Sequence, residues 1–116
     1  MKTRVLLVMV AFLAGLDLAG QLGRDPATNQ PVPGGIEAET RQALTNTREV
    51  LREANMDFAD VVNVTAFLVD FKDFDGYNKV YREFFPKDPP ARATVAVAAL
   101  NQGGRVEPQM IAVRSR

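Results

Sequence analysis

The chain contains no histidine and no cysteine among its 116 residues. Without histidine it lacks the commonest metal ligand and general base of enzymes, and without cysteine it lacks disulfides, thiolate nucleophiles and thiolate metal sites. Any chemistry must therefore use carboxylates, arginine, lysine, tyrosine, hydroxyl groups, the backbone or water.

An excess of charge of either sign is also absent. Fourteen Lys and Arg residues balance fourteen Asp and Glu residues, so the formal net charge at pH 7 is zero. No overall field attracts RNA, DNA or an anionic membrane. The sequence also lacks a basic stripe with interleaved aromatic residues, which is typical of nucleic-acid-binding surfaces. We therefore do not expect nucleic acid as a partner.

The length of the chain predicts one domain over residues 1–116. The first 20 residues of the chain allow two interpretations. A basic start, a twelve-residue apolar run and small residues resemble a secretory signal, which would mean export. The run is too short to cross a bilayer as a helix, so we expect no membrane anchor. We prefer two buried β-strands that turn near Ala14 and Gly15, in a cytoplasmic protein, because the rest of the chain is otherwise short of sheet.

Later segments alternate between helical and extended patterns. Apolar residues at helical spacing predict two helices, the first ending at Asn55 and the second before Pro86. Three apolar runs predict strands, of which the first is central and apolar on both faces, and the last two form a hairpin. The predicted class is α+β, with the order β-β-α-β-α-β-β and two helices on one face of a mixed sheet. The helices cover residues 36–54 and 71–85, and the strands cover residues 60–70, 92–99 and 105–113.

The segment PPARATVAVAAL, residues 89–100, places an arginine at the start of a strand of small residues. Alternation puts Arg92 and Thr94 on one face together with two alanines. Such short side chains leave space that Leu or Phe would fill. This face of the strand is therefore predicted to line a small cavity with a cation at one end.

Glu107 lies near the start of the last strand, which the predicted hairpin would place beside the Arg92 strand. The two residues are either a structural ion pair or charges at the rim of the sheet, or they form a site in which Arg92 binds a carboxylate and Glu107 orients or deprotonates water. Asn78 lies beside Tyr77 and Tyr81 on the buried stripe of the second helix. Its amide is either satisfied within the core or part of that site.

Four segments together resemble the RidA/YjgF family of enamine/imine deaminases, also called L-PSP endoribonuclease-like or translation-inhibitor-like proteins. The resemblance runs from Ala19 to Val113. It implies a chorismate-mutase-like homotrimer whose sites lie in clefts between subunits. The segments are AGQLGRDPATNQPVPGGIEAETRQAL, DVVNVTAFLVDFKDFDGYNKVYREFF, PPARATVAVAAL and GGRVEPQMIAV.

The resemblance implies hydrolysis of small 2-imino or 2-enamino acids to 2-oxo acids and ammonia. The family's carboxylate-binding arginine falls on Arg92 and its catalytic acid on Glu107, while Asn78, Thr94 and Gly20 would shape the substrate pocket. No metal or cofactor is expected, because a protonated imine is already an electrophile. The alternatives are a catalytically weak trimeric binding module for 2-oxo acids and, with less support, a ribonuclease.

The sequence also departs from the family pattern. No tyrosine stands around Val5 and Leu6, where family members carry one in the site, and Ala19 replaces the usual serine. Pro108 replaces an isoleucine and removes a strand N–H, so we expect a sheet edge or a bulge there, and Gln109 replaces a second acid. The missing tyrosine motivates the binding-module alternative.

Overall fold

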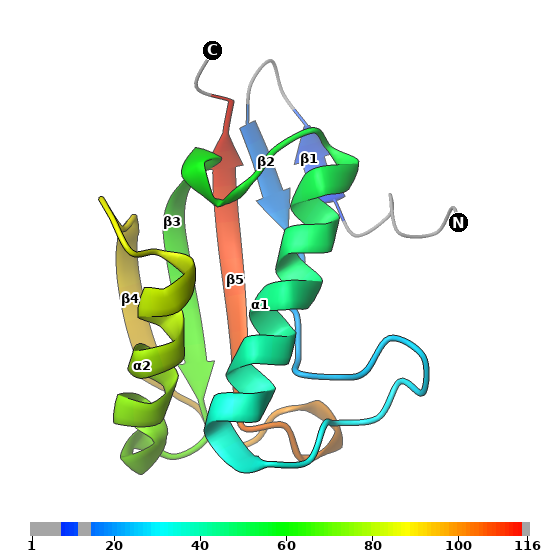
Figure 1. Ribbon diagram of the computed structural model, residues 1–116, viewed down its shortest axis with the longest axis vertical. Coiled ribbons are helices and arrows are strands. Elements are labelled where there is room, and N and C mark those ends of the chain that lie inside the picture. Colours follow the sequence, from blue (N-terminus) through cyan, green and yellow to red (C-terminus); the bar gives the residue numbers. More distant parts are fainter. Residues whose placement is uncertain (1–7, 12–14, 115–116) are drawn as a thin grey trace.

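Five strands form one mixed sheet, and two helices cover one of its faces (Figure 1). The computed structural model describes residues 8–11 and 15–114. The strand order across the sheet is β1-β2-β5-β3-β4. The element order is the predicted β-β-α-β-α-β-β, which confirms the α+β class. The elements are β1 (Val8–Ala11), β2 (Gly15–Leu18), α1 (Gly35–Glu53), β3 (Val61–Leu68), α2 (Phe74–Phe84), β4 (Ala91–Ala96) and β5 (Val106–Val113).

The N-terminal apolar run forms β1 and β2, which pair antiparallel. This pairing agrees with the strand interpretation of the run, although the predicted turn at Ala14 lies outside the described residues. Among the residues that the structure describes, no helix is long and apolar enough to cross a membrane.

The sheet places β5 between β2 and β3, antiparallel to both. Among the described strands β4 pairs only with β3, and the pairing is parallel because the chain crosses over through α2 between these two strands. The predicted hairpin between β4 and β5 is therefore wrong, since β3 lies between them. β4 is an edge strand.

The core lies between the helices and one face of the sheet. On β3, Val64, Ala66 and Leu68 are fully buried under the helices, whereas Thr65 and Phe67 on the other face are only half-buried. Although β3 is apolar on both faces, a single chain covers only the face toward the helices. The helix residues buried in this core include Ala43, Leu44, Val50, Leu51, Tyr77, Val80 and Tyr81.

Both helices stop where the sequence predicts. After α1, Asn55 adopts a left-handed conformation with φ of 59°, and its backbone N–H donates to Arg52 at 3.0 Å. α2 ends at Phe84, and Pro86 follows two residues later. The chain is then free to return to the sheet as β4, which carries Arg92.

Candidate active site

Arg92 lies on the helix-covered face of the sheet, beneath α2. Its register partner on β3 is Val64, which is fully buried on that face. The guanidinium carbon lies 4.5 Å from the ring centroid of Tyr81 and 5.4 Å from that of Tyr77, so the cation stacks on aromatic rings. Within residues 15–114, no carboxylate forms an ion pair with Arg92, and its polar neighbour is the neutral phenol of Tyr77. The guanidinium can therefore bind an anion.

A cavity of about 340 Å³ opens beside this guanidinium. Its walls come from α2, the following loop and the start of β4, and no Asp or Glu lines it. The volume suits a small organic acid. The residues that line it are Asn78, Tyr81, Arg82, Phe85, Pro89, Pro90 and Arg92.

Asn78 is half-buried in the wall of this cavity. Its amide makes no hydrogen bond to another residue of the described ranges, so the interpretation as an amide satisfied within the core is wrong. An amide free on a cavity wall can donate to or accept from a ligand. Thr94 lies on the same face as Arg92, opposite Ala66 of β3, but it does not line the cavity.

The phenols of Tyr77 and Tyr81 cannot act as acids or bases at ordinary pH. Burial raises the pKa of Tyr77 far above its usual value and also raises the pKa of Tyr81, and the positive charge of Arg92 offsets only part of each shift. Both side chains therefore remain neutral platforms for the guanidinium.

Glu107 lies on the opposite face of the sheet. Its register partner on β3 is Phe67, whereas the buried neighbours Val106 and Pro108 point to the helices. A structural ion pair between Arg92 and Glu107 of one chain is therefore excluded. The structure divides the predicted site residues into two groups, with Arg92, Asn78 and Thr94 on the helix side and Glu107 with Gly20 on the other.

Gly20 packs its backbone directly against the Glu107 side chain. A Cβ atom at position 20 would lie 3.0 Å from both Cγ and Cδ of Glu107, and closer still to its carboxylate oxygen. The next residue, Gln21, donates its backbone N–H to the carbonyl of Pro108 at 3.2 Å. The loop after β2 thus fixes the place of the carboxylate, and only glycine permits this approach.

We predict that Gly20→Ala lowers the catalytic rate roughly tenfold with little loss of thermal stability, because the added Cβ displaces the Glu107 carboxylate. A catalytic group displaced by about 1 Å costs up to about 100-fold in rate, and the displacement here is smaller. Gly15→Ala is the matched control, since a Cβ at that position would come no closer than 4.0 Å to a neighbouring atom. Steady-state kinetics and melting curves on both variants measure the effect. Equal activities of the two variants would contradict the prediction.

Pro108 lies in an interior strand, but it interrupts no backbone hydrogen bond between paired strands. The pairing of β2 with β5 ends at the pair of Asp17 and Ile111, before Pro108 is reached. The Pro108 carbonyl points to this side, where it accepts from Gln21, and the ring nitrogen of the same residue points the same way. The strand is thus locally an edge at Pro108, as predicted, and the bulge in its pairing with β3 lies elsewhere, at Val61 to Asn63.

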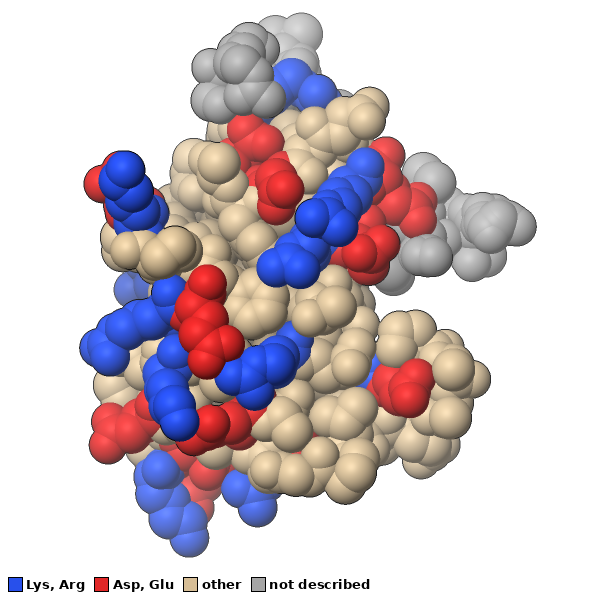
Figure 2. All heavy atoms as spheres, in the orientation of Figure 1, with Lys and Arg blue, Asp and Glu red and all other residues tan. Residues whose placement is uncertain are grey.

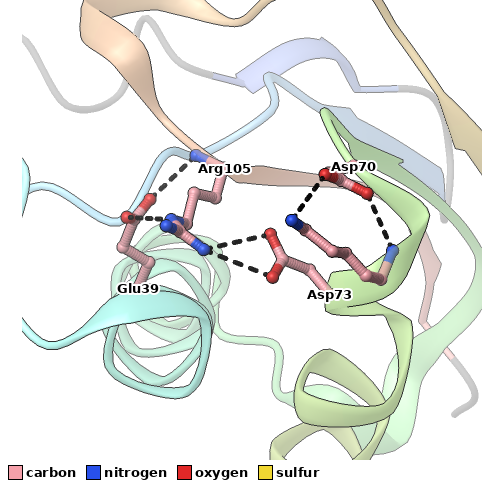
Figure 3. A network of polar contacts seen from close by, with 5 residues as sticks. Glu39, Asp70, Asp73 and Arg105 are labelled. Carbon is pink, nitrogen blue, oxygen red and sulfur yellow. Dashed lines mark hydrogen bonds and ion pairs between the residues drawn. The ribbon is translucent and has the colours of Figure 1, made fainter.

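An ion-pair network links the start of β5 to α1 and to the start of α2 (Figure 3). The backbone N–H of Arg105 donates to the Glu39 carboxylate of α1 at 2.9 Å, and its guanidinium contacts Asp73, directly before α2, at 3.3 Å. Glu39 and Asp73 are both buried. Because Glu107 lies two residues after Arg105, the network also fixes the strand position of this acid.

A second hollow, of about 560 Å³, lies between the loop after β2 and α1. It borders Gly20 and Gln21 but neither Arg92 nor Glu107, and both acids and an arginine line it. Its mixed charges do not select a ligand class. The cavity beside Arg92 is smaller, but the residues that line it include two arginines and no acid.

Sequence reasoning missed part of this cavity. It assigned Tyr81 to the core alone and did not single out Arg82, Phe85 or the two prolines. Asn78, Arg82 and Phe85 follow helical spacing along one face of α2, so the spacing was a usable signal once Asn78 had been selected. The contribution of Pro89 and Pro90 depends on how the loop returns to the sheet.

The comparisons with known proteins agree with this architecture. The model of the family named Endoribonuclease L-PSP matches residues 10–114. A protein of Capra hircus named 2-iminobutanoate/2-iminopropanoate deaminase is 52% identical over 97 residues, 84% of this chain and 71% of that protein. The Homo sapiens protein of the same name is 42% identical over the same shares.

Solved structures show the same fold. The RidA protein of the Antarctic bacterium Psychrobacter superposes with a TM-score of 0.85 at 35% identity, covering 90% of this chain and 84% of that one. E. coli TdcF with bound serine superposes with a TM-score of 0.86 at 30% identity, covering 91% and 85%. The chain therefore belongs to the endoribonuclease L-PSP family, which is the RidA/YjgF family.

Proposed function

We propose that the protein hydrolyses small 2-imino and 2-enamino acids to 2-oxo acids and ammonia. The observation that carries the proposal is the unpaired Arg92 guanidinium in a cavity without acids, which is suited to hold the carboxylate that all these substrates share. The names of the goat and human relatives support the same reaction class.

The proposed reaction needs only a held carboxylate and a positioned water. Arg92 binds the substrate carboxylate through two N–H donors, and Asn78 orients the substrate in the cavity. Glu107 accepts a proton as the water oxygen bonds to the carbon of the protonated C=N group. The proton then passes to the nitrogen, and the C–N bond breaks while the added hydroxyl group loses its proton to Glu107, which gives ammonia and a 2-oxo acid. An enamino acid first tautomerises to the imine.

The proposed site is completed by a second copy of the chain. Arg92 and Glu107 face opposite sides of the sheet, so one chain does not present both to the same substrate. The face that carries Glu107 also exposes three large apolar side chains, of which Val95 is 40%, Ile111 41% and Val113 38% exposed. Burial of such a face against identical copies is consistent with a homotrimer that joins the two halves of the site.

The test is to generate 2-aminoacrylate from serine with a dehydratase and follow the release of ammonia and 2-oxo acid. We expect wild-type protein to accelerate hydrolysis above the buffer rate, and Arg92→Ala to remove most of the acceleration. A wild-type rate no faster than buffer would exclude the deaminase.

The second candidate is a trimeric module that binds 2-oxo acids without turnover. Its support is the sequence around Val5 and Leu6, which lacks the family tyrosine and lies outside the described residues. Calorimetry with 2-oxobutanoate separates the two functions. Binding at millimolar or lower concentration without deamination supports the module, whereas the absence of binding counts against both.

A ribonuclease is not supported by the charges of this chain. Figure 2 shows acidic and basic side chains interspersed over the helix-covered face, without a continuous basic track, and the net charge is zero. Cleavage of RNA by protein free of contaminating nucleases, lost in Arg92→Ala, would reverse this conclusion.

We predict that Arg92→Lys weakens the binding of 2-oxobutanoate at least about tenfold, because lysine keeps the charge but loses the planar two-point contact. Folding should change little, since Arg92 has no ion pair within residues 15–114. Calorimetry and a melting curve on the same preparation measure both effects. Unchanged affinity together with loss of the trimer would show a structural role for Arg92.

A further inference from the structure

A second guanidinium lines the cavity that contains Arg92. Arg82 lies on α2, one helical turn after Asn78, and its side chain is exposed at the cavity wall. It makes no hydrogen bond or ion pair with any residue in the described part of the chain. Of the described residues, two arginines without an ion pair and no acid line this cavity.

The acid next to Arg82 in the sequence, Glu83, is already paired with another residue, and so is the nearest basic residue of α2, Lys79. Glu83 binds Arg41 of α1 at 2.8 Å, and Lys79, one turn before, binds Glu37 at 3.3 Å. These pairs join α2 to α1, and Arg82 does not take part in them. An unpaired arginine at a cavity wall offers up to five N–H donors to a ligand.

A substrate with one carboxylate uses only one of the two guanidinium groups. We propose, on the basis of the proposed function, that the site selects 2-imino acids that carry a second carboxylate on the side chain. Arg92 then holds the 1-carboxylate, and Arg82 binds the side-chain carboxylate. The shape of the cavity agrees with such a ligand. Phe85, Pro89 and Pro90 form an apolar wall against which the methylene groups between the two anions can lie.

The experiment compares two imines produced in situ by amino acid oxidases, one from glutamate and one from 2-aminobutyrate. We expect wild-type kcat/KM to be higher for the glutamate-derived imine, and Arg82→Gln to lower the ratio of the two values about tenfold. Lys87→Gln is the matched control, because Lys87 is an exposed cation of the nearby loop that does not line the cavity. It should leave the ratio unchanged.

Calorimetry with 2-oxoglutarate and 2-oxobutanoate provides a readout that does not depend on turnover. We expect Arg82→Gln to weaken 2-oxoglutarate binding about tenfold relative to 2-oxobutanoate, and added salt to reduce the wild-type preference. Turnover of both imines without a preference, or the same ratio in Arg82→Gln as in wild type, would overturn this inference and leave the proposed function intact. Failure of both turnover and 2-oxobutanoate binding would instead reject the proposed function.

Discussion

Glu107→Gln is expected to lower kcat for imine hydrolysis by about 100-fold or more, in the range that a positioned acid or base contributes. Glutamine has nearly the same size and keeps the contact with Gly20, but its amide cannot take a proton from water. The affinity for 2-oxobutanoate should change far less, because in the proposed site the carboxylate is bound by Arg92 and not by Glu107. Steady-state kinetics and calorimetry on the same variant measure the two effects.

Asp17→Asn is the control for this prediction. Asp17 is a half-buried acid on the same face of the sheet, and it pairs with Ile111, four residues along β5 from Glu107. Its replacement removes the same charge from the same face without touching the proposed water site. Loss of activity in both variants would show a general effect of charge, and an active Glu107→Gln would refute the role of Glu107 as the base.

Mixing Arg92→Ala with Glu107→Gln should restore activity that neither variant has alone. If each site takes Arg92 from one subunit and Glu107 from its neighbour, a site between the two variants can contain both intact residues. Random assortment into closed trimers gives this combination at about one site in four, so we expect roughly a quarter of wild-type activity. The two proteins are refolded or expressed together before the assay.

The outcome of this mixing experiment separates a shared site from a site within one chain. Differently tagged variants allow the mixed trimers to be purified and their composition to be measured by native mass spectrometry. The mixture of separately prepared, unexchanged trimers is the control and should remain inactive. Mixed trimers without recovered activity would exclude a site that joins Arg92 and Glu107 from two subunits.

The local structure followed closely from sequence patterns. Helical spacing, Asn55 and Pro86 predicted both helices and their ends, and apolar runs predicted the strands. These signals depend on side chains within a few residues of each other, so a single sequence contains them.

The arrangement of the candidate site could not be predicted in the same way. Alternation correctly assigned the residues that share a face within each strand, but it does not say which strands are neighbours. The insertion of β5 between β2 and β3 and the register of Arg92 with Val64 and of Glu107 with Phe67 depend on long-range packing. These pairings decide that the two charged residues face opposite sides.

The stacking of Arg92 on aromatic rings has an energetic consequence for ligand capture. A guanidinium packed over the rings of Tyr81 and Tyr77 has already lost part of its rotamer freedom before a ligand arrives, and no salt bridge within the described residues must be broken to release it. Little of the binding free energy is then spent on immobilising the side chain. A small acid, which makes few contacts, can therefore be bound by a guanidinium that is already held in position.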